Sequence, residues 1–133
     1  MPISTVSRLC AALLVLQAAC GSSSGYTTNP GGGGYSDPVQ AATISVDNPY
    51  NFTPSTVTVV KGGTVTWNWT GANHNVTSVL SPSFSPGSGT HDAPYTFGPV
   101  TFATAGSYRF ICSVHGSVSG SNVSGMNGTV TVQ

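Results

Sequence analysis

Hydrophobic and polar residues alternate along much of the chain beyond residue 40, which is the pattern of β-strands with one buried face. The clearest run is Thr64 to Thr70, where Val65, Trp67 and Trp69 fall on one face. Turn-forming residues such as Lys61-Gly62-Gly63 separate the runs, and no stretch after residue 20 has a sustained helical period. The runs that predict strands are 43–46, 56–60, 64–70, 76–80, 95–97, 99–102, 108–112 and 126–132.

The number and spacing of these runs predict the fold class. Seven or eight short strands between residues 42 and 133 are typical of a β-sandwich. Thr, Ser, Val, Gly and Asn dominate this region, which suits strands with polar but uncharged outer faces. We therefore expect an all-β domain.

The first twenty residues have the features of a secretory signal. Arg8 supplies a positive charge, and the apolar stretch from Leu9 to Ala19 is too short to span a bilayer. The segment ends Leu16-Gln17-Ala18-Ala19-Cys20, which is similar to a bacterial lipobox, where the Cys carries the lipid. We expect residues 1–20 to be a lipoprotein-type signal peptide and Cys20 to be the only membrane contact. Ordinary cleavage after Ala19 is the alternative, because Gln17 departs from the usual aliphatic residue.

The composition changes after Cys20. Residues 21–41 are rich in Gly, Ser and Pro and predict a flexible tether. The folded domain is expected to cover residues 42–133. A signal peptide followed by a tether places this domain outside the cytoplasm, in the periplasm or at the cell surface.

Charge is scarce and balanced. The chain has three Lys and Arg residues against three Asp and no Glu. This balance offers no field to attract nucleic acid or an anionic membrane surface. A hydrolase that depends on paired carboxylates is also disfavoured, and no Ser-His-Asp order or phosphate-binding loop is present. We expect that the protein is not an enzyme.

Four side chains that bind metals fall at the ends of predicted strands. They are His74, Cys112, His115 and Met126. Counting by twos from Tyr108 and Phe110 points Cys112 into the sandwich. Alone, each of the four could be an ordinary core or surface residue. Together, two His, one Cys and one Met are the ligand set of a mononuclear copper site, whereas structural zinc usually takes more thiolates.

The cysteines agree with this interpretation. Cys10 lies in the signal segment and Cys20 at its end, so Cys112 is the single thiol of the expected domain. A lone thiol in an oxidising compartment is a liability unless a metal or a partner occupies it. A Cys20–Cys112 disulfide is the alternative.

From residue 42 onward the chain resembles the plastocyanin-type cupredoxins. The matching motifs are Phe52-x-Pro54-x2-Val57-x-Val59-x2-Gly62-x2-Val65-x-Trp67, His74-Asn75-Val76, Gly106-x-Tyr108-x-Phe110-x-Cys112-Ser113-Val114-His115 and Gly125-Met126-x-Gly128-x-Val130-x-Val132. The resemblance implies a Greek-key β-sandwich with one copper ion. It implies that His74, Cys112 and His115 are equatorial ligands and Met126 the axial ligand. It also implies a hydrogen bond between Asn75 and Ser113, outside the ligand shell.

One segment departs from the family. Ten residues, 116–125, separate His115 from Met126, where the family has few. The segment is rich in Gly and Ser, so we expect it to loop out and return at Gly125-Met126. A backbone carbonyl near Asn73, or no ligand, is the alternative at the axial position.

The resemblance implies a type 1 copper protein that carries single electrons between extracytoplasmic partners, with a redox partner docking near His115. The alternative is a copper-binding or delivery module without an electron-shuttle role. A fragment similar to nitrite reductase is a weaker candidate. A second copper site needs several more His, and only His91 remains.

Overall fold

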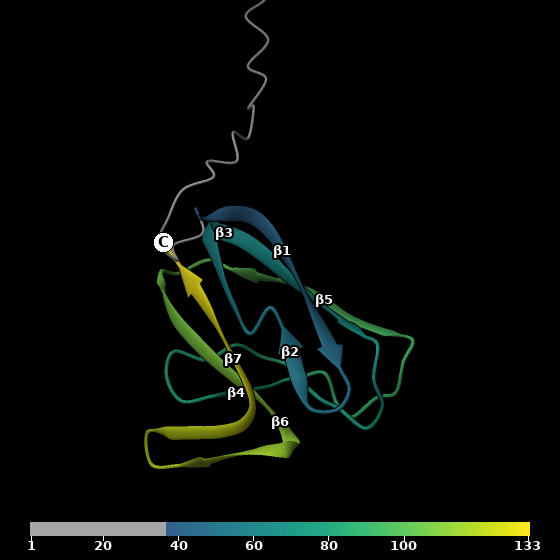
Figure 1. The fold of residues 1–133 in the computed structure, drawn as a ribbon. Coiled ribbons are helices and arrows are strands. Elements are labelled where there is room, and N and C mark those ends of the chain that lie inside the picture. The colour runs from purple at the N-terminus through teal and green to yellow at the C-terminus, as the bar shows by residue number, and fades with distance from the viewer. Residues whose placement is uncertain (1–36) are drawn as a thin grey trace, which may run out of the picture. The chain divides into compact units, whose positions relative to one another are not determined.

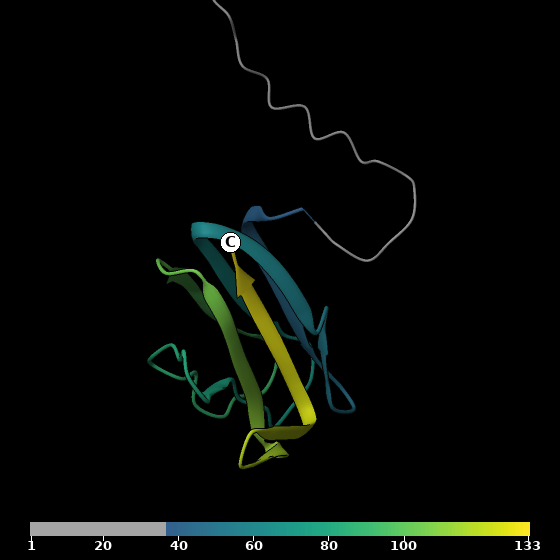
Figure 2. The ribbon, with the colours of Figure 1, turned by 90° about the vertical axis from the view of Figure 1, so that its left-hand side faces the viewer.

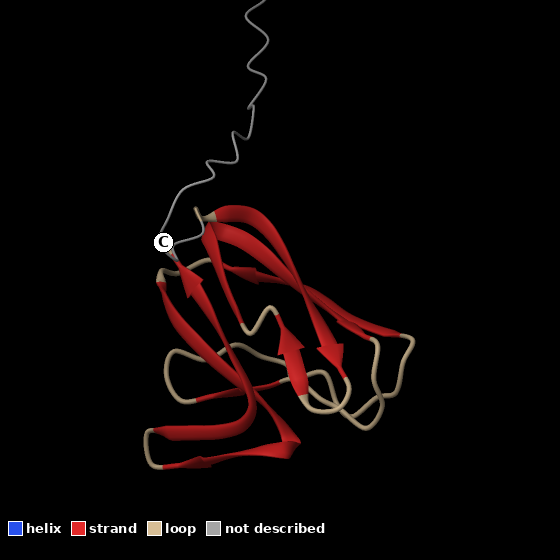
Figure 3. Cartoon of the chain, viewed as in Figure 1, coloured by secondary structure: helices blue, strands red, loops and turns tan. Residues whose placement is uncertain are grey.

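The computed structural model describes residues 37–133, which form seven strands and no helix (Figures 1 and 3). This confirms the all-β prediction. The strands are β1 (Val39–Asp47), β2 (Asn51–Thr53), β3 (Thr56–Trp69), β4 (Thr77–Val79), β5 (Tyr95–Phe102), β6 (Gly106–Ser119) and β7 (Asn122–Val132). The predicted signal peptide, Cys20 and most of the tether lie outside the described residues. Within residues 37–133, no helix has the length and apolar character needed to span a bilayer.

The strands form a mixed sheet that folds into the two layers of a Greek-key sandwich. Hydrogen bonding follows the order β2-β1-β3-β7-β6-β4, and β5 pairs with β3. The first half of β3, Thr56–Val59, runs parallel to β7. The second half, from Gly63 to Trp69, pairs with β1 on one side and β5 on the other, and Val59 of the first half also pairs with Val39 of β1. A single strand therefore belongs to both layers, and the chain reverses within it (Figure 1).

The reversal of β3 lies at the predicted turn Lys61-Gly62-Gly63. Gly62 has φ of +83°, a conformation that L side chains rarely adopt. A Cβ on Gly63 would lie 2.8 Å from the carbonyl oxygen of Val60 and 2.9 Å from that of Gln40. The two glycines thus let β3 bend tightly against β1 without leaving the sheet.

The alternating positions fill the space between the layers, as predicted. Val65, Trp67 and Trp69 are buried, and so are Tyr108, Phe110 and Cys112 of the opposing layer. The Trp67 and Phe110 rings meet edge to face with centroids 5.5 Å apart, and Phe52 meets Phe110 at 4.8 Å. Such pairs contribute about 0.5–1.5 kcal/mol each beyond the area they bury.

Three local features differ from the sequence prediction. β1 begins at Val39, ahead of the expected domain boundary at residue 42, because Val39 pairs with Val59 and Ala41 with Thr64. The two runs 95–97 and 99–102 form one strand, β5, which pairs with β3 on both sides of a local irregularity. The short strand β2 was not predicted; its three residues pair with the end of β1.

The prediction that residues 116–125 loop out is wrong. Gly116–Ser119 pairs with Asn122–Gly125 as an antiparallel hairpin that extends β6 and β7. Gly120 has φ of +59° in the two-residue turn, as hairpin turns of this length favour. The hairpin lies at the end of the sandwich away from the C-terminus (Figures 1 and 2).

Candidate metal centre

Three predicted ligands come together at one end of the sandwich. His74 lies between β3 and β4, whereas Cys112 and His115 lie in β6. The two His Nδ1 atoms are 3.1 Å apart, and Cys112 Sγ is 3.8 Å from His74 Nδ1 and 3.5 Å from His115 Nδ1. His74 and Cys112 are fully buried, and His115 is half-buried. The three donor atoms therefore converge on one point, with one ligand close to solvent.

The triangle of donor atoms has the size that a metal ion requires. The point equidistant from the three atoms lies about 2 Å from each, close to ordinary metal bonds to imidazole nitrogen and thiolate sulfur of roughly 2.0–2.3 Å. One thiolate and two imidazoles combine soft and borderline donors, which suits copper in both oxidation states. These residues fit a single copper ion.

The protonation of His74 also fits a ligand. Its Nε2 lies 3.2 Å from Asn48 Oδ1. A carbonyl oxygen can only accept, so Nε2 carries the proton and the Nδ1 lone pair faces the other ligands. Burial, followed by the nearby charge of His115, lowers the pKa of His74 below its ordinary value of 6.5. The neutral imidazole, which binds metal, is therefore favoured.

An irregularity in β6 brings Cys112 and His115 to the same site. Residues three apart in a regular strand point to opposite faces. The ladder between β6 and β7 is interrupted between Ile111 and Gly116, and the intervening residues turn both ligands toward His74. Beyond the interruption, Gly125 has φ of +73°, and a Cβ there would lie 2.3 Å from the His115 carbonyl oxygen. Gly125 thus permits the close approach of β7 to His115.

The segment that carries His74 is fixed by its neighbours. His74 and His91 exchange two backbone hydrogen bonds of 3.1 and 2.9 Å. Trp69 Nε1 donates to the His74 carbonyl oxygen at 3.0 Å. Asn73, which has φ of +59°, donates its backbone N–H to Asp92. His74 is therefore held independently of any metal.

Asn75 and Ser113 are hydrogen-bonded, as the resemblance implied. Asn75 Nδ2 donates to Ser113 Oγ, and the Ser113 backbone N–H donates to Asn75 Oδ1, both at 2.8 Å. Each residue directly follows a ligand, so the two bonds join the His74 segment to the Cys112 segment.

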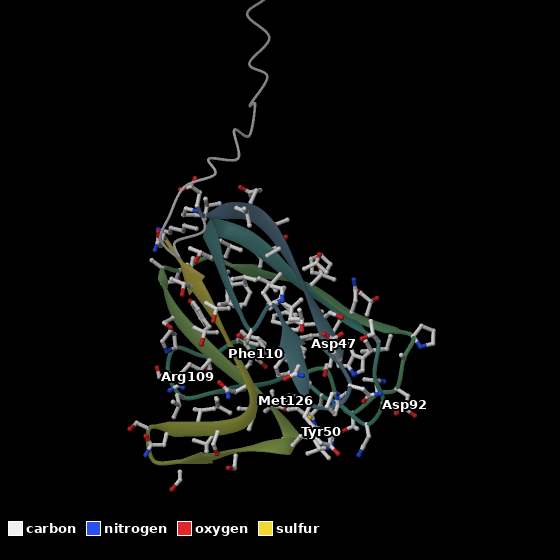
Figure 4. All side chains as sticks on the ribbon, in the orientation of Figure 1. Asp47, Tyr50, Asp92, Arg109, Phe110 and Met126 are labelled. Carbon is white, nitrogen blue, oxygen red and sulfur yellow. The ribbon has the colours of Figure 1, made fainter. Side chains whose placement is uncertain are left out.

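Met126 lies in β7 immediately after Gly125 and is 2% exposed. It belongs to the same buried cluster as Cys112. Figure 4 shows it at the end of the sandwich where Tyr50 also lies. Its place is compatible with an axial ligand, and its ligation stays a prediction.

Sequence reasoning missed two residues at the site, Asn48 and Tyr50. Asn48 bonds to His74, and the Tyr50 ring lies 4.3 Å from that of His115. Both lie in the turn between β1 and β2, and neither belongs to a motif that could have identified it. His91, the third His of the chain, is half-buried and stacks on Tyr95 with ring centroids 3.5 Å apart.

Residues 39–133 match the family described as copper binding proteins, plastocyanin/azurin family. No curated protein sequence matches the chain. A pseudoazurin from Sinorhizobium meliltoi is 19% identical, with a TM-score of 0.51 over 70% of this chain and 73% of that chain. An oxidised amicyanin variant is 19% identical, with a TM-score of 0.52 over 71% and 84%. A copper-containing nitrite reductase from Thermus scotoductus is 22% identical, with a TM-score of 0.50 over 79% of this chain and 25% of that chain. These likenesses show a shared fold.

Proposed function

Because the chain belongs to the plastocyanin/azurin family of copper-binding proteins, we propose that it carries single electrons between redox partners outside the cytoplasm. The observation that carries this proposal is the convergence of His74, Cys112 and His115, whose ligand atoms all lie within 4.8 Å of one another. Copper bound there would cycle between Cu(I) and Cu(II).

The residues around the ligands suit electron transfer because they keep the ligands in place. Two hydrogen bonds join Asn75 to Ser113, and two backbone bonds join His74 to His91. Ligands held by such contacts move little when the charge of the ion changes, which keeps reorganisation small. Burial of His74 and Cys112 excludes water from two of the three ligands.

The protein is proposed to transfer electrons without catalysing a reaction of its own. The chain has three His, and two of them are in the site. The third, His91, is bonded through Nε2 to the Ser88 carbonyl oxygen at 2.8 Å and stacked on Tyr95. This leaves no set of imidazoles for a second copper site among residues 37–133. The chain also spans only 25% of the nitrite reductase that it resembles.

The proposed docking surface for a redox partner surrounds His115. Val114 is 45% exposed and Val118 38% exposed, and Val123 is half-buried opposite Val118 in the hairpin. The described residues carry only Lys61 and Arg109 against three Asp. We expect a partner with a largely uncharged, apolar surface at its own redox centre.

The proposed location rests on the sequence before the domain. A lipid at Cys20 would hold the domain at a membrane surface, with residues 21–36 as part of the tether. Fractionation of cells that express the full chain tests this. The wild type should sediment with membranes, and Cys20→Ala should not. Equal partitioning of the two forms would exclude the anchor.

The experiment that tests the function is a titration of the purified protein with Cu(II). One equivalent should produce an intense visible thiolate-to-copper band, and Cys112→Ser should abolish it, because a hydroxyl cannot replace the soft thiolate. Voltammetry should then show a reversible one-electron wave. A coloured protein without a reversible wave, and with rapid loss of copper to a chelator, would favour the delivery alternative. A copper complex without this band would overturn the assignment of a thiolate-ligated type 1 site.

A further inference from the structure

One short turn contacts both histidine ligands. Residues 48–50 join β1 to β2. Asn48 Oδ1 accepts the hydrogen bond from His74 Nε2 at 3.2 Å. Two residues later, the Tyr50 ring lies over His115 with centroids 4.3 Å apart and planes inclined by 37°. Tyr50 also meets the edge of His74 at 6.4 Å. Asn48 and Tyr50 therefore reach the two ligands by different kinds of contact.

The contact of Asn48 fixes the orientation of His74. An imidazole that binds a metal through Nδ1 can still rotate unless its other nitrogen is held, and such outer contacts commonly change metal affinity by about 10–100-fold. Within the described residues, Asn48 Oδ1 is the hydrogen-bond partner of His74 Nε2. The ring position of this buried ligand thus depends on a side chain from an exposed turn.

The turn is itself attached to the segment that carries His74. The Val46 carbonyl oxygen accepts hydrogen bonds from the backbone N–H groups of Thr70 and Gly71, each at 3.0 Å. Gly71 leaves room for the Asn48 side chain. A Cβ at Gly71 would lie 2.8 Å from Asn48 Oδ1 and 2.9 Å from its backbone nitrogen. The position of Asn48 is therefore defined by the fold.

Tyr50 covers the ligand that lies closest to solvent. Its side chain is 56% exposed, yet its ring lies against the imidazole of His115, which is half-buried. A ring in this place hinders water and chelators from approaching His115 and restricts its rotation.

We propose that Asn48 and Tyr50 form a clamp that controls how fast copper leaves the site. Asn48 is the positioning residue for His74, and Tyr50 covers and positions His115. The clamp rests on the proposed copper site. It adds that the turn between β1 and β2 controls how long the site retains its metal.

The first test measures copper release from the loaded full-length chain to a chelator in excess. Asn48→Ala should release copper about ten-fold faster or more. Asn48→Asp, which keeps an oxygen acceptor, should restore slow release. Asn51→Ala is the matched control, because Asn51 is an exposed residue of the same type in the adjoining strand β2. Tyr50→Ala should accelerate release, and Tyr50→Phe, which keeps the ring, should behave as the wild type.

The second test needs no copper. In ¹⁵N-labelled protein without metal, His74 should show a slowly exchanging Nε2–H signal that Asn48→Ala removes and Asn51→Ala leaves.

The outcomes of the two tests separate the clamp from the proposed function. A wild type that takes up no copper would overturn the proposed function and the clamp together. A wild type that binds copper, with equal release rates in all five variants, would overturn the clamp alone. An Nε2–H signal that survives in Asn48→Ala would overturn the role of Asn48.

Discussion

Asn75 and Ser113 exchange two hydrogen bonds of 2.8 Å across segments that are 38 residues apart in sequence. Each residue directly follows a predicted metal ligand, so the pair sets the separation of His74 and Cys112 before any metal arrives. Asn75 is 6% exposed, and its amide has little access to water as an alternative partner. The metal-free protein should therefore already hold its ligands in place.

Asn75→Ala should lower the free energy of unfolding of the metal-free protein by about 1–3 kcal/mol, because it removes the hydrogen bonds of this side chain with Ser113, Thr90 and Thr77 and leaves the Ser113 N–H unpaired. Urea denaturation measures this loss. Asn68→Ala is the control, since Asn68 makes one exposed hydrogen bond with Thr96 and its loss should cost less. In the copper-loaded protein the visible band should also shift in Asn75→Ala. Equal losses of unfolding free energy in the two variants would show that the buried hydrogen bonds of Asn75 stabilise the fold no more than the exposed one of Asn68.

Gly125→Ala should disturb the site, whereas Gly120→Ala should not. Both glycines have positive φ, of +73° and +59°, so alanine at either costs about 1–2 kcal/mol of backbone strain. At Gly125 the new Cβ would also collide with the His115 carbonyl oxygen, whereas Gly120 has open space around it. We expect a larger loss of stability in urea and faster copper release for Gly125→Ala alone. Similar release rates in the two variants would contradict this account of Gly125.

The stability of the metal-free protein should fall as the pH is lowered through the range in which His74 titrates. Burial and the charge of His115 lower the pKa of folded His74 below 6.5. Between the folded and unfolded pKa values the unfolded chain binds more protons, so stability is complete above the unfolded pKa and is lost as the pH falls toward the folded pKa.

Urea midpoints measured from about pH 8 to pH 5 check this slope around the ordinary His pKa. His74→Gln should flatten the slope. His91→Gln is the control, and its urea midpoint should keep the part of the pH dependence that arises from His74. A wild-type midpoint that rises as the pH falls would contradict the prediction.

Electron exchange through the surface around His115 should depend on its apolar residues and little on salt. Val118→Asp should slow self-exchange between the Cu(I) and Cu(II) forms several-fold, because two copies would bring like charges together at the contact. Val39→Asp is the matched control. Val39 has the same exposure, 38%, but lies at the start of β1, at the far end of that strand from Tyr50. The wild-type rate should change little between low and physiological ionic strength. A steep salt dependence, or equal effects of the two substitutions, would exclude this surface.

The sequence alone was sufficient to predict the β-sandwich and the three residues whose metal-binding atoms converge. Alternation at Val65, Trp67 and Trp69 reports burial directly, because one strand face lies in the core. The ligands are recognisable because their chemistry is rare in a chain with so few charges. Asn48 and Tyr50 could not be found in this way, since Asn and Tyr are ordinary in a turn and their role arises from contacts with residues far along the chain.

The hairpin at residues 116–125 illustrates the same limit. Gly and Ser predict a loop from composition, yet the cross-strand register Gly116–Gly125 to Ser119–Asn122 creates a regular ladder. Backbone pairing does not require strong β-formers when the flanking strands already fix the register. Met126 directly follows Gly125, which pairs with Gly116, so the hairpin sets the position of Met126.

Met126→Leu tests whether this position supplies the axial ligand. Met126 is 2% exposed in the cluster that contains Cys112, and it follows the glycine that lies against the His115 backbone. Axial bonds in such sites are long and weak, so the loss of a thioether should retune the reduction potential without releasing the ion. We expect Met126→Leu to stay blue with a raised potential, because a weak donor to Cu(II) has been removed. His115→Leu, which removes a strong donor, should greatly weaken copper binding.

Leucine in place of a buried methionine costs less than about 1.5 kcal/mol of stability, so urea denaturation of the metal-free Met126→Leu variant separates a packing effect from a ligand effect. An unchanged spectrum and potential in Met126→Leu would make Met126 a core residue only and leave the axial position to a backbone carbonyl near Asn73 or to no ligand.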